Sequence, residues 1–357
     1  MLENTGMFRP ADLVGRSASL WRYHEALGLP ESAARVTLGE GFTPMAPVPL
    51  FGRTILAKMD FLCPTGSYKD RGSTVMLSKL REWGLKEIIE DSSGNAGASI
   101  AAYSALGGIR AKIYIPLSTS AGKAAQIAMY GAELIKTPGS REDTAHAAWQ
   151  AASETFYASH NWSPYFLAGM KTAAYEIAEQ LGWDPPEWVI TPAGGGSLAV
   201  GLHLGFQELY DAGITPRVPR MVLVQAARCA PIYAAWRDGR TDVPAITKQD
   251  TAAEGISVAK PVRGREILEA ARATNGFVHT VNEDEIWEGL SALGATGVYV
   301  EPTSAVVAAA AKQLIGTGVI ADEESVVIVL TGNGLKATDK IVQHQQAQVG
   351  ADLASVR

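Results

Sequence analysis

Pro64-Thr65-Gly66-Ser67-Tyr68-Lys69-Asp70-Arg71-Gly72 is the stretch that decides the fold, because its lysine stands where an extended run gives way to a helical pattern. Residues 54–60 are extended, and the helical pattern begins at Asp70. Glycines free the backbone on both sides, and Ser67 and Asp70 are residue types that can cap a helix. Lys69 is then either an ordinary solvated side chain or an amine placed to form a Schiff base with an aldehyde cofactor.

Strands and helices alternate along most of the chain. The pattern predicts strands over residues 54–60, 86–91, 110–116, 132–137, 155–159, 188–191, 221–225, 277–281 and 326–330. It predicts helices over residues 20–27, 120–130, 142–153, 167–181 and 198–209. Residues 1–50 otherwise read as irregular, and residues 250–261 as a long functional loop. This alternation predicts an α/β protein with open, mostly parallel sheets flanked by helices.

Composition limits the class of protein and its partners. The 357 residues are 47% hydrophobic and 19% charged, which suits about two domains. The net charge of −6 without a basic run argues against nucleic acid as a partner. Cys63 and Cys229 lie far apart and no metal-ligand spacing occurs, so we expect no metal site. The start, Met1-Leu2-Glu3-Asn4-Thr5-Gly6, lacks a signal pattern, and no apolar run is long enough for a membrane span, so we expect a cytoplasmic protein.

A second loop, Ser92-Ser93-Gly94-Asn95-Ala96-Gly97, follows a buried strand and opens an alanine-rich helix. Backbone amides and hydroxyls at the positive end of a helix form an anion site. For the two serines alone, a capping turn is the favoured interpretation. Asn95 is different, because an amide between two glycines is placed to bond a group outside the fold.

A third loop, Pro192-Ala193-Gly194-Gly195-Gly196-Ser197, also joins a strand to a helix. Its three glycines, Gly194, Gly195 and Gly196, let backbone amides close round a phosphate, and Ser197 adds a hydroxyl. A tight turn remains an alternative. The pattern does not match the lysine-containing phosphate loop of nucleoside triphosphatases or an early dinucleotide fingerprint.

The last strong strand ends at Leu330-Thr331-Gly332-Asn333-Gly334. Thr331 is a candidate partner for the ring nitrogen of pyridoxal phosphate, the aldehyde cofactor that these loops together would hold. A hydroxyl there, rather than a carboxylate, leaves the nitrogen largely unprotonated, which suits elimination and replacement better than transamination. A simple turn remains an alternative for Asn333 and Gly334.

Together these motifs resemble a fold-type II pyridoxal-phosphate enzyme of the tryptophan synthase beta superfamily, and within it a threonine synthase. Further resembling segments are Leu38-Gly39-Glu40-Gly41-Phe42-Thr43-Pro44, Lys171-Thr172-Ala173-Ala174-Tyr175-Glu176, Ala253-Glu254-Gly255-Ile256 and Tyr299-Val300-Glu301-Pro302-Thr303-Ser304. They occur in the family's order and cover about residues 20–340. The resemblance implies a large cofactor-binding domain formed by residues 1–74 and 166–357, and a small domain formed by residues 75–165.

The resemblance also assigns roles to the loops. Lys69 would carry the cofactor and act as the catalytic base, and residues 194–197 would bind the cofactor's phosphate. Asn95 would contact the ring hydroxyl oxygen of the cofactor. The carboxylate of an amino-acid substrate would lie on the loop formed by Ser92, Ser93, Asn95 and Ala96. A homodimer is expected, since such folds are usually dimeric.

One segment departs from the resembled family. Threonine synthases commonly place an arginine before the helix that follows an Asn-Pro-Tyr motif, and it helps to hold the substrate's phosphate. Here the stretch is His160-Asn161-Trp162-Ser163-Pro164-Tyr165-Phe166, so Phe166 replaces that arginine and removes a bidentate clamp. His160 falls in the segment that faces the substrate in the family, so it is a candidate substrate contact.

The sequence therefore predicts elimination or replacement at the β or γ carbon of an amino acid, in a threonine synthase-like enzyme. O-phosphohomoserine is expected to be a poor substrate unless another cation, such as Lys123 or Arg263, replaces the arginine. An eliminating lyase of the serine/threonine dehydratase type is the alternative reaction. A non-catalytic ligand-binding relative is the alternative of another class, although it would not require the lysine.

Overall fold

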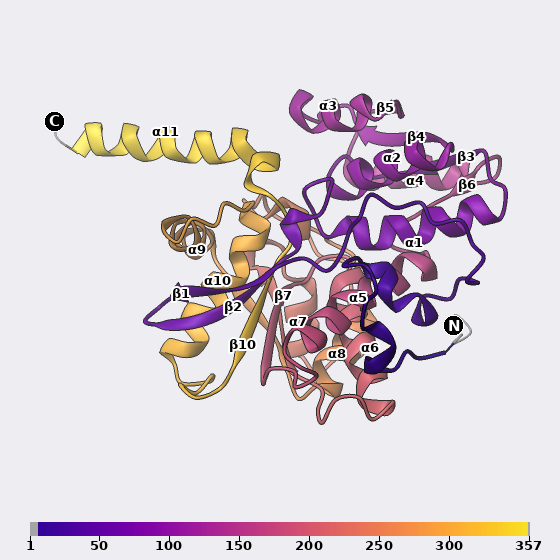
Figure 1. Ribbon diagram of the computed structural model, residues 1–357. Helices are drawn as coiled ribbons and strands as arrows, with labels where there is room; N and C mark the ends of the chain where they lie inside the picture. The colour runs from indigo at the N-terminus through magenta and orange to yellow at the C-terminus, as the bar shows by residue number, and fades with distance from the viewer. Residues whose placement is uncertain (1–5, 356–357) are drawn as a thin grey trace.

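The computed structural model describes residues 6–355, which form two separate β-sheets with helices around them (Figure 1). The first residues, where no signal pattern was found, lie partly outside this range. The larger sheet has the strand order β1-β2-β10-β7-β8-β9. Its strands are β1 (Met45–Leu50), β2 (Arg53–Met59), β7 (Trp188–Pro192), β8 (Arg220–Ala226), β9 (Phe277–Val281) and β10 (Val326–Leu330). All neighbours run parallel except β1 and β2, which pair antiparallel.

The smaller sheet is parallel throughout, with the order β5-β4-β3-β6. Its strands are β3 (Glu87–Glu90), β4 (Arg110–Pro116), β5 (Glu133–Thr137) and β6 (Phe156–Tyr157). All of them fall inside the range predicted for the small domain. The predicted α/β class with mostly parallel sheets is thus confirmed.

The α-helices connect and cover the strands. They are α1 (Lys69–Glu82), α2 (Asn95–Gly107), α3 (Ala121–Met129), α4 (Arg141–Ala151), α5 (Pro164–Gln180), α6 (Ser197–Asp211), α7 (Pro231–Arg237), α8 (Gly264–Ala273), α9 (Glu283–Ala295), α10 (Pro302–Gly316) and α11 (Thr338–Ser355). Helices α1 and α5 cross the predicted domain boundaries at residues 74 and 165 and pack into the core of the smaller sheet. The division at these residues stays a prediction. In Figure 1, α11 projects from the rest of the molecule.

Both faces of the larger sheet are buried. On β8, Val222 and Val224 belong to a core cluster shared with α9 and α10, whereas Met221 and Leu223 belong to one shared with α5, α6 and α8. Successive side chains of a strand point to opposite faces, so a run of hydrophobic residues needs helices on both sides.

The first fifty residues are less irregular than predicted. Strand β1 lies at the edge of the larger sheet and contains Pro47 and Pro49. An edge strand tolerates proline because one side of its backbone needs no ladder hydrogen bond, which is why the strand was missed. The helical segment predicted over residues 20–27 is a 3-10 helix, Leu20–Ala26.

The order of the strands brings the predicted loops together. Strands β2, β10 and β7 are neighbours, and the segments that follow them carry Lys69, Thr331 and the three glycines. The carboxyl ends of parallel strands share one edge of a sheet, which is the usual place for a ligand in an open α/β fold.

Candidate active site

Lys69 is the first residue of α1, and its loop is tied to the loop after β10. The amide of Tyr68 donates to the carbonyl of Thr331 (3.0 Å), and the amide of Asn333 donates to the carbonyl of Gly66 (2.9 Å). The backbone of Gly66 has a φ of 83°, a conformation that favours glycine. The Lys69 amine lies 4.6 Å from the centre of the Tyr68 ring. The lysine is thereby held next to Thr331.

The two predicted helix caps have other roles. The carboxylate of Asp70 accepts hydrogen bonds from the amide (2.7 Å) and hydroxyl (2.5 Å) of Thr65 and from the hydroxyl of Ser99 (2.6 Å). The hydroxyl of Ser67 is fully buried and lacks a hydrogen-bond partner within residues 6–355. Leaving a hydroxyl buried without a partner is costly. Ser67 is therefore available to bond a ligand close to Lys69.

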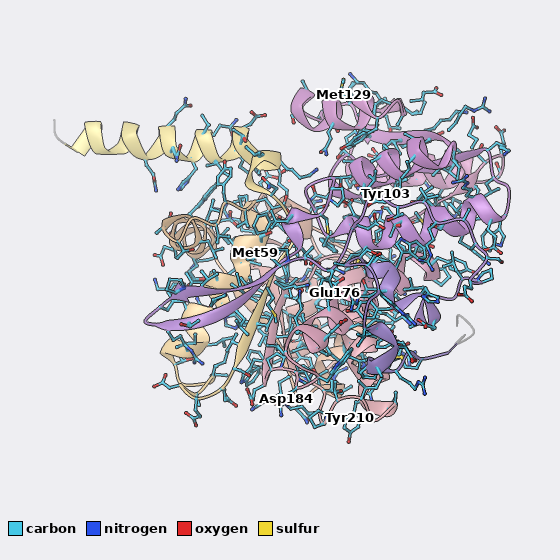
Figure 2. All side chains as sticks on the ribbon, viewed as in Figure 1. Met59, Tyr103, Met129, Glu176, Asp184 and Tyr210 are labelled. Atoms are coloured by element: carbon cyan, nitrogen blue, oxygen red, sulfur yellow. The ribbon has the colours of Figure 1, made fainter. Side chains whose placement is uncertain are left out.

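A closed cluster of four fully buried charges lies behind the lysine and consists of Lys58, Asp60, Arg71 and Glu176. Arg71 donates to both oxygens of Asp60 (2.7 Å each) and to both of Glu176 (2.5 and 2.7 Å). Lys58 also pairs with Glu176, at 2.7 Å. Burial alone would raise the pKa of Glu176, but the two cations lower it to about 2. Glu176 is labelled near the middle of the molecule in Figure 2.

This closed cluster anchors the start of α1, because Arg71 is only two residues from Lys69. Two bidentate contacts fix the planar guanidinium in orientation as well as position. The sequence analysis missed the cluster. The only sequence signal is an arginine in the first turn of the lysine helix, together with Glu176 in one of the resembling segments.

The loop of Gly194, Gly195 and Gly196 forms a tight cradle before α6. A Cβ atom on Gly195 would lie 2.7 Å from Oδ1 of Asn161, and one on Gly194 would lie 3.0 Å from Cα of Ile256. Gly196 has a φ of 105°. Side chains would therefore fill the cradle, and their absence exposes backbone amides at the N-terminus of a fifteen-residue helix. Ser197 is the first residue of that helix.

Thr331 is buried and its hydroxyl is oriented by Ser304. The hydroxyl oxygen of Ser304 accepts from the amides of Thr331 and Gly332, both at 2.9 Å, and lies 2.9 Å from Oγ1 of Thr331. Because the Ser304 oxygen already accepts from two amides, a third hydrogen bond to it from Thr331 is disfavoured, and the Ser304 hydrogen can go to Thr331 or to the carbonyl of Gly332 (3.3 Å). The hydroxyl hydrogen of Thr331 is then left to be donated to a ligand. That arrangement suits an unprotonated pyridine nitrogen.

Asn95 begins α2 and reaches across to the larger sheet's side of the site. Its Nδ2 donates to the two carboxylate oxygens of Glu301, at 3.1 and 3.2 Å. A carboxylate only accepts hydrogen bonds, so this contact fixes which end of the amide faces Glu301. Ser92 and Ser93 are half-buried and Ala96 is buried in the same loop, at the amino end of the helix. The sequence analysis quoted Glu301 in a motif but gave it no role.

An open cluster, Glu90, Asp91, Arg141 and His160, lies directly before that loop. Nδ1 of His160 and Oε1 of Glu90 are 2.5 Å apart, and Arg141 donates to Oδ2 of Asp91 at 2.7 Å. Burial raises the pKa of Glu90, and His160 opposes this shift. Burial would also raise the pKa of Asp91, but Arg141 and His160 outweigh it, so this pKa is lowered. Glu90, Asp91 and His160 could ligate a cation geometrically, yet Arg141 already neutralises Asp91 and His160 already engages Glu90.

Phe166 is fully buried in α5, on the side of the site that carries Lys69. Its ring centre lies 5.7 Å from the Lys69 amine and 6.0 Å from the ring centre of His160. A Cβ atom on Gly72 would lie 2.5 Å from this ring, so the ring packs directly on the first turn of α1. The substrate role assigned to Phe166 stays a prediction.

The two cations considered as replacements for the missing arginine differ in place. Arg263 lies against Gly196 and pairs with Glu266 at 3.2 Å, so it borders the glycine cradle. The side chain of Lys123 lies outside the described part of the structure.

These residues fit pyridoxal phosphate on structural grounds. Four features meet at one edge of the larger sheet. They are a lysine at a helix start, a glycine cradle at a helix N-terminus, a threonine with a hydroxyl hydrogen to donate, and a buried serine without a partner in the described residues. Phosphate, pyridine nitrogen and aldehyde each find a group of the matching chemistry.

The fold and this site define a pyridoxal-phosphate dependent enzyme of fold type II. Residues 36–332 match the family model described as "Pyridoxal-phosphate dependent enzyme", and the chain belongs to that family. Its curated relatives include the threonine synthases of Methanocaldococcus jannaschii and of Synechocystis. The first is 34% identical, and the match covers 94% of this chain and 84% of the relative. The second is 37% identical, and the match covers 94% of this chain and 89% of the relative. The protein is thus a threonine synthase-like, pyridoxal-phosphate dependent lyase.

Solved structures agree with the fold. The chain is similar to a threonine deaminase from the organism abbreviated T.th., with a TM-score of 0.69, 25% identity and coverage of 82% of this chain and 92% of that one. Maize serine racemase superimposes with a TM-score of 0.72 at 22% identity, covering 85% of this chain and 93% of its own. The second likeness concerns the fold alone.

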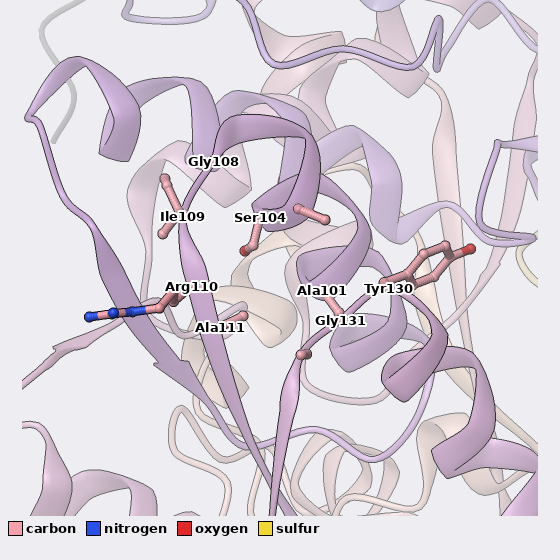
Figure 3. Close-up of a pocket in the computed structure, with 10 residues that line it drawn as sticks. Ala101, Ser104, Gly108, Ile109, Arg110, Ala111, Tyr130 and Gly131 are labelled. Carbon is pink, nitrogen blue, oxygen red and sulfur yellow. The ribbon is translucent and has the colours of Figure 1, made fainter.

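Two further features lie apart from the site. A shallow pocket of about 170 Å³ is lined by the end of α2, the start of β4 and Tyr130 (Figure 3). It lies at the opposite end of α2 from Asn95, about 20 Å away for a thirteen-residue helix.

Within the described residues, no helix is long and apolar enough to cross a membrane.

Proposed function

We propose that this enzyme catalyses elimination or replacement at the β or γ carbon of an amino acid that lacks a phosphate group. The proposal is supported by the buried, unpartnered hydroxyl of Ser67 close to Lys69, together with the expectation from the family resemblance that Phe166 stands where a phosphate-binding arginine would be. Bound pyridoxal phosphate supplies an electron-withdrawing ring that acidifies the α-proton of the amino acid. The chain's own residues supply the rest.

Lys69 would hold the cofactor through its amine, and the same amine would accept the α-proton of the amino acid. The tie between Tyr68 and Thr331 and the closed cluster behind Arg71 keep this amine in position. The residues Ser92, Ser93, Asn95 and Ala96 bind the substrate's carboxylate at the N-terminus of α2. The hydroxyl of Thr331, rather than a carboxylate, favours loss of a leaving group over transamination.

Two related reactions remain open for this site. Formation of threonine, whose hydroxyl is on the β carbon, is what the threonine synthase relatives' name suggests, and elimination at the β carbon is suggested by the similarity to a threonine deaminase. Phe166 favours elimination, because a phosphate leaving group would lack its guanidinium. The non-catalytic alternative is disfavoured, since a binding module would not require Lys69. The expectation of a homodimer rests on the family resemblance alone, and that of a cytoplasmic location rests on the sequence alone.

The test has two parts. Borohydride reduction of the yellow protein, followed by peptide mapping, should place the cofactor on Lys69; a label on another lysine would contradict the assignment. Steady-state assays should then compare phosphorylated and unphosphorylated amino acids for released phosphate, keto acid and ammonia. Efficient formation of threonine and phosphate from O-phosphohomoserine would refute the proposed substrate class and indicate an ordinary threonine synthase.

A further inference from the structure

His160 and Glu90 form a pair whose geometry suggests a chemical role. Glu90 is fully buried, and its carboxylate forms two hydrogen bonds with His160, one with Nδ1 (2.5 Å) and one with the backbone amide (3.3 Å). The side chain of His160 is 11% exposed, and its Nε2 has no hydrogen-bond partner within the described residues. The ring is therefore fixed through one nitrogen while the other remains open.

The pair lies near the reacting lysine. The rings of His160 and Phe166 are 6.0 Å apart, and the Phe166 ring is 5.7 Å from the Lys69 amine. The next residue, Asn161, places its side-chain oxygen against the glycine cradle, where a Cβ atom on Gly195 would lie 2.7 Å away. The segment that carries His160 thus borders the cofactor site between the glycine cradle and the substrate loop.

The charges around the pair favour a state in which Nε2 carries a hydrogen. Asp91, Arg141 and the Tyr157 hydroxyl face the pair, and the ion pair of Arg141 with Asp91 is neutral. Buried charges are stable only when they are balanced, so the pair of Glu90 and His160 is favoured as a neutral unit. Whether the shared proton then resides on the carboxylate or on Nδ1, Nε2 has a hydrogen to donate.

We propose that His160, positioned by Glu90, donates this proton to a hydroxyl leaving group, so that the substrate is a β-hydroxy amino acid. This inference rests on the proposed function and narrows it. Lys69 removes the α-proton, the bond between the β carbon and oxygen breaks with its electron pair on oxygen, and the Nε2 proton completes a water molecule. Glu90 then holds the remaining proton of the pair on Nδ1. A later water releases a keto acid and ammonia, so no oxidant or reductant is needed.

Leaving-group chemistry supports the β-hydroxy class. Phosphate leaves without protonation but needs a cation to hold it, whereas hydroxide needs an acid. Phe166 removes the guanidinium expected for phosphate, and the pair of His160 and Glu90 supplies an acid. Elimination at the β carbon needs only two proton-transfer groups, which Lys69 and His160 provide. Elimination at the γ carbon would require a further base for the β-proton.

The experiment compares substrates with poor and good leaving groups. The enzyme loaded with cofactor is assayed for keto-acid formation from L-serine, L-threonine and β-chloro-L-alanine, whose chloride leaves without an acid. His160→Asn should lower kcat for the hydroxy substrate by about 10²- to 10⁴-fold, the usual effect of losing a general acid. The same variant should change kcat for β-chloro-L-alanine by less than about tenfold, which also shows that it is folded.

Glu90→Gln should lower kcat for the hydroxy substrate by less than His160→Asn does, and it should again spare β-chloro-L-alanine. The amide oxygen of the new glutamine can still accept a hydrogen bond from Nδ1, although the negative charge is gone. His146→Asn is the matched control, since His146 is an exposed histidine of α4 that contacts Gln150. It should leave both reactions unchanged.

Two results would overturn this inference and leave the proposed function standing. One is an equal loss of kcat for the hydroxy and the chloro substrates in His160→Asn. The other is a wild-type enzyme that eliminates chloride from β-chloro-L-alanine but water from neither L-serine nor L-threonine. Failure of the wild type to eliminate any leaving group would instead refute the proposed function along with it.

Discussion

The closed and open clusters both hold buried charges near Lys69, yet they differ in how completely those charges are satisfied. In the closed cluster all four side chains are fully buried, and each carboxylate meets a guanidinium or an ammonium group. In the open cluster Arg141 is 35% exposed and His160 keeps one nitrogen unoccupied. A saturated network can only hold a structure in place, whereas an unsaturated one can still bind or transfer a proton. The difference separates positioning from chemistry within one site.

The largest effect is expected from breaking the closed cluster. Arg71→Ala would leave Asp60 and Glu176 buried with only Lys58 to compensate them. Removing one partner from a buried ion network typically costs about 3–5 kcal/mol. We expect a fall of that size in the free energy of unfolding, measured by urea denaturation with cofactor bound. Arg71→Lys, which keeps the charge but not the two bidentate contacts, should lose less. A loss below about 1 kcal/mol for Arg71→Ala would show that the cluster does not anchor α1.

The second effect concerns Asp70, a buried carboxylate that is bound by two hydroxyls and one amide instead of a guanidinium. Burial raises its pKa to about 6, against hydrogen bonds from Ser99 and Thr65 that lower it. The folded state therefore binds this proton more tightly than the unfolded chain. Protonated Asp70 therefore contributes to the free energy of unfolding below about pH 4, and this contribution is lost as the pH rises through about 6. The free energy of unfolding should change by roughly 3 kcal/mol, which corresponds to about two pKa units.

Asp70→Asn should abolish this slope. The free energy of unfolding of the wild type, minus that of the variant, should decrease between about pH 4 and about pH 7. Asp143→Asn is a control of opposite sign, because hydrogen bonds from Ser140 lower the pKa of exposed Asp143. For that control, the same difference should increase as the pH rises. A difference for Asp70→Asn that does not vary with pH would contradict the assignment.

The third effect adds a charge beside the open cluster. Phe166→Arg should raise kcat/KM for O-phosphohomoserine by about 10- to 10⁴-fold. One or two charge-assisted hydrogen bonds of about 1.5–3 kcal/mol each would be gained, and about 1.4 kcal/mol is a factor of ten. Phe166→Leu controls for loss of ring packing on Gly72, and retention of the cofactor spectrum shows that each variant is folded. No gain in a folded Phe166→Arg variant would show that the phosphate site is missing more than an arginine.

The smallest effect is expected at the rim of the open cluster. Arg141→Ala removes a partly exposed cation but leaves the buried carboxylate of Asp91 without it, so the cost should lie between the about 0.2–1 kcal/mol of an exposed ion pair and the about 3–5 kcal/mol of a buried one. Its free energy of unfolding should therefore fall less than that of Arg71→Ala under the same conditions. Equal losses in the two variants would mean that the clusters do not differ in the way proposed.

The sequence could propose a cofactor site because the motifs for it are local. The three glycines and Thr331 closely follow a strand, and Lys69 and Asn95 begin the helices that come after β2 and β3, so backbone geometry limits what these segments can bind. A lysine at a helix start or three consecutive glycines can be recognised without knowing the neighbours. The alternation of strands and helices likewise predicted the α/β class, since the spacing of hydrophobic residues in the sequence indicates where strands and helices lie.

Partners distant in the chain were decided by the tertiary structure alone. Glu176 lies 105 residues from Arg71, Glu301 lies 206 residues from Asn95, and Glu90 lies 70 residues from His160. Nothing in the local pattern distinguishes these carboxylates from exposed ones, because their burial depends on which helices and strands pack together. The predicted cap at Asp70 failed for a related reason: its carboxylate is bound by Thr65 and by Ser99, which the fold brings to it.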